Sequence, residues 1–412
     1  MKIAVVGSGI SGLSAAYYLS KKHQVDLFEK QDHFGGHSHT LDLSINKKKI
    51  AVDIGFIVFN HITYPNLINF FEEINVDIEK SDMSFSVSVE NTNFEYCGKG
   101  LKRIFANKSN ILNIQFLKMF IDIIKFYKNC DQIKEYEEKI TLGEFLNENN
   151  WSDNFINYHL IPMVSAIWSM PPSDASKMPL KFFLKFFQNH GLFKLKKRPK
   201  WFTVTNRSRA YVEKVLSKIS GEYFKNYEIK SVYRNKKSVR LYYGSSNEYF
   251  DYDKVVLATH ADEALSLIEN PTDREKKILS NFQYKKNLAV IHSDEKFMPK
   301  NKKTWSSWNS LIDYNNLEKN SVTYWLNLLQ NLKINQNIFL TLNPFLNISE
   351  DKVFKRVNLT HPYYDQNTLL NQRQLSTIQN KENILYCGSY FGYGFHEDGI
   401  KSSIEMIKNL NV

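Results

Sequence analysis

The chain has 412 residues, of which 42% are hydrophobic, and no run of about 20 apolar residues that would span a membrane, so two domains without a membrane helix are expected. Its formal net charge of +11 allows nucleic acid, anionic lipid or an acidic substrate as partner, but no nucleic-acid module is recognisable, and a composition rich in Lys, Asn and Ile explains the charge equally well. Three cysteines without paired spacing, Cys97, Cys130 and Cys387, indicate a reducing compartment and no metal site.

The first predicted element is a βαβ unit that binds a dinucleotide. Residues 3–6 form a short apolar run typical of a buried parallel strand, and Gly7, Gly9 and Gly12 follow it directly. In such a unit the first glycine makes the tight turn and the second lets backbone approach a pyrophosphate. The third lets the next helix pack on the strand, with the helix N-terminus facing the phosphates.

Glu29 ends the second predicted strand, residues 24–28. An acid about 20 residues after the glycines is where a pair of ribose hydroxyls is bound. A carboxylate there would repel a 2′-phosphate, so NADP is disfavoured, whereas NAD and FAD both stay open. The alternative is a plain glycine turn with a solvated Glu29.

Mixed elements follow in the first two thirds of the chain. The doublet Gly35-Gly36 suits a loop passing close to a nucleotide, or a plain turn. Spacing of apolar residues then predicts a strand broken by a glycine at 51–60, a helix at 61–75 and a pair of strands at 83–98. Two helical regions follow, at 111–130 and 141–190.

The remaining chain again contains short apolar runs typical of buried parallel strands. Residues 254–260 and 384–388 read as buried parallel strands, with helices predicted at 261–269 and 399–410. Other strands are predicted at 228–234, 239–243, 287–292, 321–329 and 337–342. Parallel-type strands at the start, near 254 and at the end imply a discontinuous nucleotide domain, with a second domain inserted twice. We place the first domain at 1–75, 202–282 and 380–412, and the second at 76–201 and 283–379.

A second glycine-dense loop, 388–399, follows the last strand and precedes the last helix. With the N-terminal unit and the Gly35-Gly36 doublet, it resembles the FAD-dependent amine oxidase and phytoene desaturase superfamily. The resemblance is closer to a bacterial branch of NAD/FAD-binding proteins, the flavin-containing amine oxidoreductases, which is linked to fatty-acid modification. The shared runs are 55–60, 166–169, 189–192, 307–309, 323–330 and 392–399.

This resemblance implies an α/β protein with a Rossmann-like FAD-binding domain, of the glutathione reductase and amine oxidase type, and a discontinuous α+β substrate domain. It also implies a tightly held FAD, with the last helix pointing its positive N-terminus at the flavin and favouring hydride acceptance. The implied FAD-binding residues are Gly7, Ser8, Gly9, Ile10, Ser11, Gly12, Glu29, Lys30, Gly35, Gly36, His37, Ser38, Gly388, Ser389, Gly392, Gly394, Phe395, Asp398, Gly399 and Ile400.

The chain departs from the family pattern at three places. His37 stands where relatives often have Arg, and Ser389 stands where many have an acid. Residues 206–208 read Asn-Arg-Ser where the branch has Gly-Gly-Ser. These departures concern the ribityl and substrate sides of the expected site more than FAD binding itself.

Candidate catalytic and substrate residues come from the flavin loop and from the inserted domain. His396 is a candidate acid or base with a pKa near neutrality, and Glu397 or Asp398 either orients it or caps the last helix. The second-rank candidates His37 and His39 have no partners at metal-ligand spacing, so no metal is expected. The candidate substrate contacts are Asn60, Tyr64, Trp305, Trp308 and Trp325, beside Asn309.

A lipid substrate has modest support from two segments. Residues 180–201 interleave large apolar residues with Lys and Arg, as on an anionic membrane surface, or form a core helix with a solvated basic loop. Residues 111–127 line an acyl tunnel or, more simply, pack in the core. We therefore expect a cytoplasmic protein, with peripheral contact to the inner membrane face through 180–201 as an open alternative.

Two enzyme hypotheses follow. In the first, the protein is an FAD-dependent desaturase or isomerase that takes hydride from an unsaturated or methylated fatty acyl chain, free or in phospholipid, to flavin N5. In the second, it is an amine oxidase that produces imine and hydrogen peroxide. A non-catalytic flavoprotein is a third hypothesis, which the dense flavin loop disfavours. Oligomeric state is not predicted.

Overall fold

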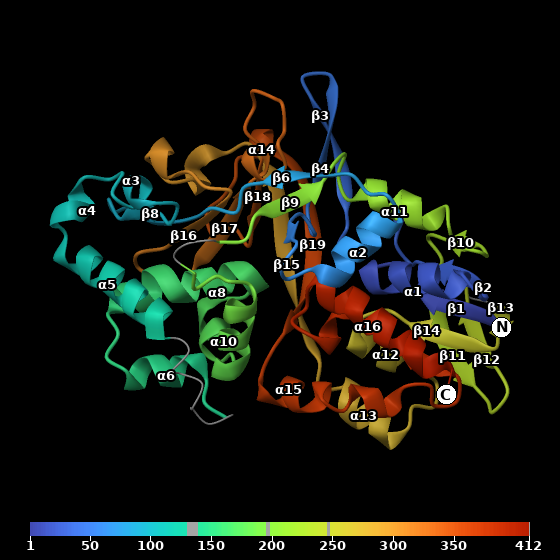
Figure 1. Ribbon diagram of the computed structural model, residues 1–412. Helices are drawn as coiled ribbons and strands as arrows, with labels where there is room; N and C mark the ends of the chain where they lie inside the picture. The colour runs from blue at the N-terminus through green and yellow to red at the C-terminus, as the bar shows by residue number, and fades with distance from the viewer. Residues whose placement is uncertain (130–138, 195–197, 245–247, 412) are drawn as a thin grey trace. The chain divides into compact units, whose positions relative to one another are not determined.

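The computed structural model describes residues 1–129, 139–194, 198–244 and 248–411 (Figure 1). The chain divides into two compact units. Unit 1 comprises Met1–Glu79, Thr203–Gln283 and Asn367–Val412, and unit 2 comprises Lys80–Phe202 and Tyr284–Gln366. Each unit is therefore discontinuous in sequence. The domain boundary drawn from the sequence between 379 and 380 differs most from this division.

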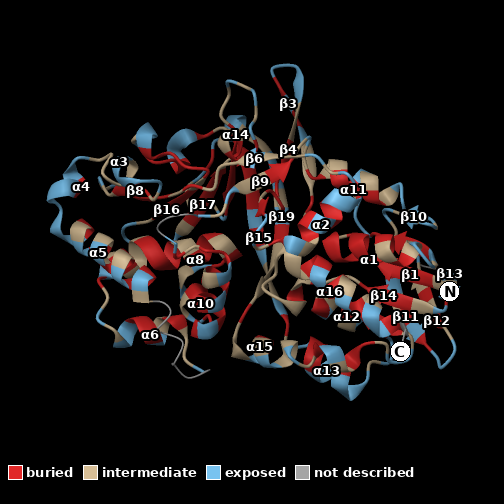
Figure 2. Cartoon of the chain, in the orientation of Figure 1, coloured by how far each residue is buried: buried red, intermediate tan, exposed pale blue. Residues whose placement is uncertain are grey.

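Unit 1 is built on a five-stranded sheet with the order β10-β2-β1-β14-β20, in which every registered pair is parallel. Apolar residues occupy both faces of β1, β14 and β20 and are buried, as expected for a parallel sheet covered by helices (Figure 2). The expectation that the start, the middle and the end of the chain share one parallel sheet is confirmed. The strands are β1 (Lys2–Val6), β2 (Gln24–Phe28), β10 (Tyr223–Phe224), β14 (Lys254–Leu257) and β20 (Ile384–Tyr386).

Helices α1 and α16 belong to the same unit and pack against each other. Ser14 Oγ on α1 and Ser403 Oγ on α16 are 2.7 Å apart. Unit 1 also contains a hairpin of β3 (Thr40–Ile45) and β4 (Lys48–Asp53). A three-stranded antiparallel sheet consists of β11 (Ile229–Arg234), β12 (Val239–Tyr243) and β13 (Glu248–Tyr252). Its helices are α1 (Ile10–Ser20), α2 (Pro65–Glu73), α11 (Arg209–Leu216), α12 (Ala261–Leu267), α13 (Asp273–Leu279), α15 (Gln366–Gln372) and α16 (His396–Lys408).

Unit 2 contains a seven-stranded sheet with the order β19-β15-β18-β17-β16-β7-β8. β7 pairs with β16 in parallel, and the pairs β16 with β17, β17 with β18, β15 with β18 and β7 with β8 are antiparallel. The strands are β7 (Phe85–Val89), β8 (Glu95–Cys97), β15 (Gln283–His292), β16 (Trp308–Ile312), β17 (Asn320–Trp325), β18 (Phe339–Leu342) and β19 (Val353–Tyr363).

The helices of unit 2 are shorter than the sequence suggests. The helical region expected at 141–190 is divided, because Pro162, Pro171 and Pro179 each stand where one helix ends or another begins. The pieces are α6 (Leu142–Glu148), α7 (Asp153–Phe155), a π-helical turn (Ile156–Leu160), α8 (Ile161–Trp168), α9 (Pro172–Ser176) and α10 (Leu180–Asn189). The others are α3 (Leu101–Ile104), α4 (Ser109–Leu112), α5 (Ile114–Asn129) and α14 (Leu326–Leu329), and Cys130 lies outside the described residues.

Short strands and turns make up the rest. A small sheet has the order β5-β9-β6, with β5 (Phe59–Asn60), β9 (Trp201–Val204) and β6 (Ile78–Ser81). The 3-10 turns are Glu295–Phe297, Lys302–Thr304, Glu350–Lys352, Leu375–Ile378, Ser389–Phe391 and Asn409–Asn411. None of the helices in the described part of the chain has the length and apolar character needed to cross a membrane.

Helix α10 decides between the two interpretations of residues 180–201, a membrane-surface segment or a core helix, for its own part of that segment. Its apolar residues, among them Phe183, Phe186 and Phe187, are buried in unit 2, and its two lysines point outward. The apolar side chains of α10 therefore pack in the core of unit 2 and are not available to enter a membrane. Within the described residues this corrects the membrane reading of the segment; residues 195–197 lie outside them.

Candidate functional site

The glycine turn between β1 and α1 contains two glycines that the protein itself requires. Gly7 has a φ of +98°, and a Cβ there would lie 2.8 Å from the carbonyl oxygen of Ala258. A Cβ on Gly12 would lie 1.8 Å from the Gly7 oxygen. Both positions are closed to any side chain, because strand, turn and helix backbones meet there.

Gly9 differs from these two glycines. Its φ of −61° suits any residue, and a Cβ added to it would meet nothing within 4 Å. The space in front of Gly9 is therefore open, on the side of the turn where α1 begins. The first N–H groups of a helix lack intrahelical partners, so this opening faces a set of backbone donors.

Glu29 connects the loops that surround the turn. Its Oε2 accepts hydrogen bonds from Ser8 N at 3.0 Å and Ser8 Oγ at 2.6 Å, and its Oε1 accepts one from Gln31 N at 2.9 Å. Since a carboxylate has about four acceptor directions, these contacts leave about one, on Oε1. Lys30, expected beside the cofactor, instead donates to Glu263 Oε1 on α12 at 2.6 Å.

The Gly35-Gly36 doublet packs on the glycine turn. Gly35 N lies 3.1 Å from both the carbonyl oxygen and the Oγ of Ser8, and a Cβ on Gly36 would lie 3.0 Å from Gly9 Cα. Both glycines have positive φ, +114° and +57°. His37 then accepts a backbone hydrogen bond from Phe56 N at 2.7 Å.

The loop before α16 reaches the same place from the far end of the chain. A Cβ on Gly399 would lie 2.7 Å from Ser11 Oγ and 2.8 Å from Ile10 Cγ2, so the first turns of α16 and α1 are in direct contact. The loop is held by Gln372, whose Nε2 donates to the carbonyl oxygens of Tyr390 and Gly392, at 2.7 Å each. The structure thus brings together the two glycine-rich segments that the sequence singled out.

His396 opens α16 and is buried. Its Nε2 lies 2.8 Å from Ser38 Oγ, which also contacts the Tyr211 hydroxyl, and its ring stacks on Phe56 with centroids 3.6 Å apart. Burial lowers the pKa of His396 well below its ordinary value, and His37 lowers it further. The pKa near neutrality expected for this residue is therefore wrong, because the imidazolium form would lose its hydration.

Glu397 does not contact His396 through any hydrogen bond that the structure shows. Its carboxylate accepts from Asn66 N, Asn66 Nδ2 and Leu67 N at 2.6–3.1 Å. These are groups in the first turn of α2, so Glu397 caps that helix. The orienting role considered for Glu397 is accordingly replaced by a capping role, although for a different helix from the one expected.

Asp398 holds the loop in front of α16. Its Oδ2 accepts from Phe395 N at 3.0 Å, and a Cβ on Gly392 would lie 2.0 Å from its Oδ1. Burial raises the pKa of Asp398 to about 7, against the lowering effect of hydrogen bonds from Phe395 and Tyr393. Asp398 is thus a half-buried carboxyl group at the start of α16 whose pKa lies near neutrality.

The expected substrate residues are divided between the units. In unit 1, Asn60 Oδ1 accepts from Ile62 N and Thr63 N, both at 2.9 Å, so its amide is occupied by a local turn. Tyr64 is buried at the start of α2, and burial raises the pKa of its hydroxyl.

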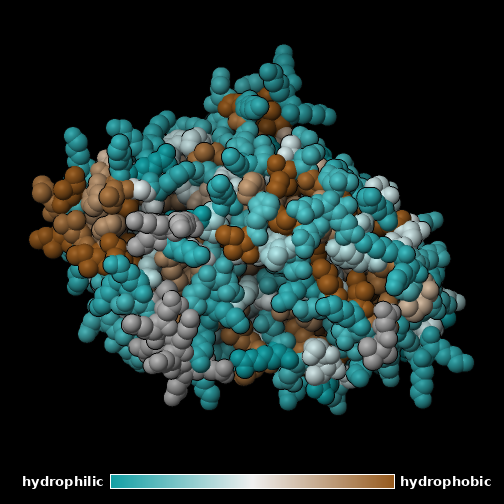
Figure 3. Space-filling view, in the orientation of Figure 1, coloured by the Kyte–Doolittle hydropathy of each residue, from teal (hydrophilic) through white to brown (hydrophobic). Residues whose placement is uncertain are grey.

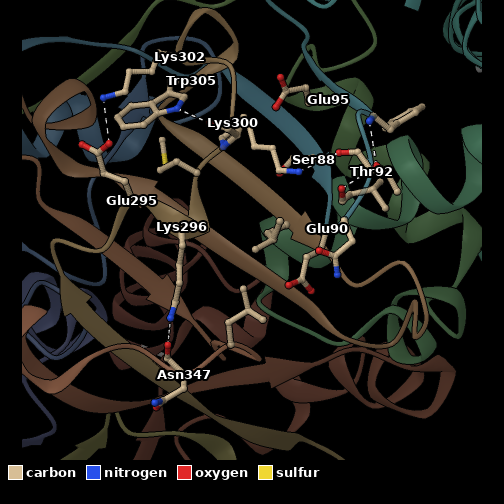
Figure 4. A pocket seen from close by; sticks show the side chains of 17 residues that line it. Ser88, Glu90, Thr92, Glu95, Glu295, Lys296, Lys300, Lys302, Trp305 and Asn347 are labelled. Atoms are coloured by element: carbon tan, nitrogen blue, oxygen red, sulfur yellow. Dashed lines mark hydrogen bonds and ion pairs between the residues drawn. The ribbon is translucent and has the colours of Figure 1, made fainter. Parts of the chain in front are cut away.

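In unit 2, Trp305 and Trp325 meet edge to face at 5.3 Å, and Trp308 packs on Tyr324 in the same way at 4.7 Å. Trp305 lines a cavity of about 650 Å³, where its Nε1 donates to the Pro299 carbonyl at 2.7 Å (Figure 4). Asn309 is buried in the sheet, and its amide accepts from Ser86 Oγ at 2.6 Å.

Sequence reasoning missed a buried polar network in unit 1. Asp53 accepts from Thr40 Oγ1 at 2.6 Å, from Ser208 Oγ at 2.7 Å and from Ser208 N at 2.8 Å. Burial raises the pKa of Asp53. Residues 206–208 differ from the Gly-Gly-Ser of the family branch but keep its serine, Ser208. This shared serine was the one sign in the sequence that Ser208 has a specific role. No group of His, Cys, Asp or Glu in the described ranges is arranged to hold a metal ion.

Comparison with known proteins agrees with this geometry. Residues 5–74 match the family model of an NAD(P)-binding Rossmann-like domain. A stretch of 79 residues is 39% identical to a 1-hydroxycarotenoid 3,4-desaturase from Flavobacterium sp. (strain P99-3); it spans 19% of this chain and only 15% of that protein.

Solved structures match over the full length at low identity. A CLA-producing fatty acid isomerase from P. acnes superposes with a TM-score of 0.67 at 13% identity, covering 100% of this chain and 98% of that one. A cyclohexylamine oxidase from Brevibacterium oxydans IH-35A gives 0.70 at 12% identity, covering 100% and 99%. At these identities the likeness shows the fold.

The chain thus has the fold of the solved fatty acid isomerase and cyclohexylamine oxidase, with a dinucleotide-binding segment at its start. More particularly, residues 5–74 are identified as an NAD(P)-binding Rossmann-like domain.

Proposed function

We propose that the protein is an FAD-dependent oxidoreductase whose cofactor is held by unit 1. The observation that carries this is the opening at Gly9, beside which the first turns of α1 and α16 are in contact. Packing alone requires glycine at positions 7 and 12, because a Cβ there would clash. Packing does not require glycine at position 9, where a Cβ would have room. A pyrophosphate approaching the backbone there supplies the missing reason.

The residues of the cradle divide the work of binding. Backbone N–H groups at the start of α1 would face the pyrophosphate, and Glu29 Oε1 would take a ribose hydroxyl. The N-terminal end of α16 would place partial positive charge beside the ring system. The doublet Gly35-Gly36 packs against Gly9, so its backbone helps to position the glycine turn.

Bound FAD would supply the acceptor for a hydride. The chain's own residues would orient the ring and exclude water. His396, neutral and bonded to Ser38, would fix the loop position rather than move a proton at neutral pH. Asp398 is a half-buried group with a pKa of about 7 and would hold a proton beside the ring.

For the substrate we propose an unsaturated or methylated fatty acyl chain, free or in phospholipid, that is desaturated or isomerised. The shared runs with the branch linked to fatty-acid modification support this, and so do the likenesses to a fatty acid isomerase and to a carotenoid desaturase. The alternative is oxidation of an amine, supported by the likeness to cyclohexylamine oxidase and to a putrescine oxidase solved with putrescine.

The test begins with the absorbance spectrum of purified protein and with the flavin released on denaturation. FAD in stoichiometric amount is expected, and protein without flavin that cannot be reconstituted with FAD would overturn the proposal. Anaerobic mixing with oleoyl phospholipid and oleic acid, against putrescine and cyclohexylamine, then distinguishes the substrates. Bleaching of the flavin by lipid, or an isomerised acyl product without net bleaching, supports the first substrate class, and bleaching by amines alone supports the second.

A further inference from the structure

Unit 2 exposes a group of large apolar side chains on α3, α4 and α5. Leu112 and Ile114 are 87% and 80% exposed, and neighbouring residues are more than half exposed. Figure 3 shows hydrophobic side chains gathered at the end of unit 2 where α4 and α5 lie. We call this set the α3–α5 surface; it comprises Leu101, Ile111, Leu112, Ile114 and Ile121.

Helix α5 is apolar on two opposite sides, which explains why the surface exists. Phe116, Met119 and Ile123 face inward and are buried, as the core requires. Ile114, Leu117, Ile121 and Ile124 recur at helical spacing on the other side and are exposed or half-buried. A helix that is apolar all round is normally covered on every side. Here the outer side of α5 has no cover within the described part of unit 2, so it fits an external apolar environment.

The segment that carries the α3–α5 surface is strongly basic. Residues 99–128 contain seven basic residues and one acid, Asp122. Asp122 is buried and accepts hydrogen bonds from Ser152 N at 3.0 Å and Ser152 Oγ at 2.5 Å, so it does not face outward. The basic residues are Lys99, Lys102, Arg103, Lys108, Lys118, Lys125 and Lys128. All but Arg103 are exposed, and Lys99 forms an ion pair with Asp82.

This combination selects among partners. A second copy of the chain meeting the surface about a two-fold axis would bring identical positive rims together, which opposes association. An anionic bilayer instead attracts each lysine and receives the apolar side chains at the boundary of headgroups and acyl chains. We propose that the α3–α5 surface docks the protein on anionic phospholipid membranes, lying in the interface without crossing it.

The proposal assigns membrane contact to a different segment from the one that the sequence pattern favoured. The phenylalanines of α10 alternate with lysines in the same manner, but they are buried. On the α3–α5 surface the apolar side chains themselves are accessible. The inference does not depend on which substrate the protein uses, because it concerns binding to lipid in the absence of turnover.

The test is flotation of the purified full chain with vesicles of phosphatidylcholine, with and without phosphatidylglycerol. Binding is expected only to the anionic vesicles and should weaken as salt is raised. The double variant Leu112→Asp, Ile114→Asp should lower partitioning about tenfold or more. The matched control is Leu370→Asp on α15, whose side chain is 55% exposed in unit 1 and should leave binding unchanged.

A second pair of variants tests the charge. Lys102→Glu with Lys118→Glu should lower partitioning about tenfold or more, whereas Lys236→Glu with Lys237→Glu, an exposed pair in a unit 1 turn, should have less effect. Equal binding of all variants, or no binding of the wild type to anionic vesicles, overturns the proposal. A wild-type dimer in sedimentation that the Leu112→Asp, Ile114→Asp variant loses, without vesicle binding, would also overturn it. Unchanged thermal unfolding of every variant establishes that folding is not the cause.

Discussion

Gly9 differs from its neighbours in the glycine turn because the folded chain leaves its side open. We expect Gly9→Val to fold normally, since its φ of −61° is ordinary and no atom lies within 4 Å of the added Cβ. The side chain would instead fill the space proposed for the pyrophosphate. FAD content after purification should fall at least about tenfold, with an unchanged midpoint of thermal unfolding for the FAD-free proteins.

The control for this variant is Gly98→Val, where an added Cβ would meet only the Phe85 oxygen at 3.7 Å. It should retain full FAD content. Normal FAD content in Gly9→Val would contradict the proposed position of the cofactor.

Asp398 makes a prediction about pH. Its folded pKa of about 7 lies above the ordinary value of 3.8, so the folded protein holds a proton that the unfolded chain has released. The stability from this group is complete below about pH 4 and is lost as pH rises towards and through 7. Asp398→Asn keeps an oxygen for the Phe395 N–H and removes the titration.

The measurement is the free energy of unfolding of the FAD-free protein, obtained by denaturant titration at several pH values between about 5 and 8. Relative to wild type, Asp398→Asn should gain at least about 1 kcal/mol over this range. A parallel pH dependence of the two proteins would contradict the assignment. Asp351, which is exposed, offers the control substitution Asp351→Asn.

At the scale of elements, helix α2 begins under a carboxylate from α16. Glu397 accepts three hydrogen bonds from Asn66 and Leu67. The N-cap residue of α2, Tyr64, makes no side-chain hydrogen bond to the helix, so Glu397 provides the cap instead. Glu397→Ala should therefore lower the free energy of unfolding by about 1–2 kcal/mol, in the range of a lost cap. Glu397→Gln should recover part of the loss, because its amide oxygen still accepts.

The comparison variant is Glu405→Ala on the same helix, where the carboxylate forms only an exposed pair with Lys401 at 3.9 Å. Its effect should stay within about 0.5 kcal/mol. Chemical denaturation of all three variants provides the measurement. An equal loss for Glu397→Ala and Glu405→Ala would show that the contact with α2 contributes nothing.

At the scale of the molecule, unit 1 is assembled from three stretches of chain, and a buried polar group built on an ion pair joins two of them. Arg234 on β11 and Glu275 on α13 form two hydrogen bonds of 2.7 and 2.8 Å, with side chains 4% and 1% exposed. Tyr386 on β20 donates its hydroxyl to the same carboxylate at 2.6 Å. The middle and last stretches of unit 1 thus share one buried polar group.

Removal of Glu275 leaves the Arg234 guanidinium buried without its principal partner. Glu275→Ala should lower the free energy of unfolding by about 3–5 kcal/mol. The exposed pair of Lys230 with Glu228 provides the control, and Glu228→Ala should change stability by less than about 0.5 kcal/mol. Equal effects of the two substitutions in urea titrations would contradict a stabilising role for the buried pair.

Local pattern predicted four of the five strands of the parallel sheet, because each of the four is a short apolar run bounded by glycine or charge. It missed β10, which has only two residues. It failed where the partner of a residue lies far away in the chain. Nothing near Glu397 in sequence indicates that it caps α2, about three hundred residues earlier, and nothing local separates the buried α10 from an exposed amphipathic helix. The pKa of His396 was misjudged for the same reason. It is lowered mainly by burial, to which the stacked ring of Phe56 belongs, and further by His37.

The sequence by itself determined the dinucleotide turn and four of the five strands of the parallel sheet, because these depend on residues that are neighbours in the chain. The tertiary structure alone decided which glycine is free to meet a ligand, which carboxylates are caps and which apolar side chains remain outside. Those properties depend on burial and on contacts between distant segments. Spacing along the chain carries no information about either.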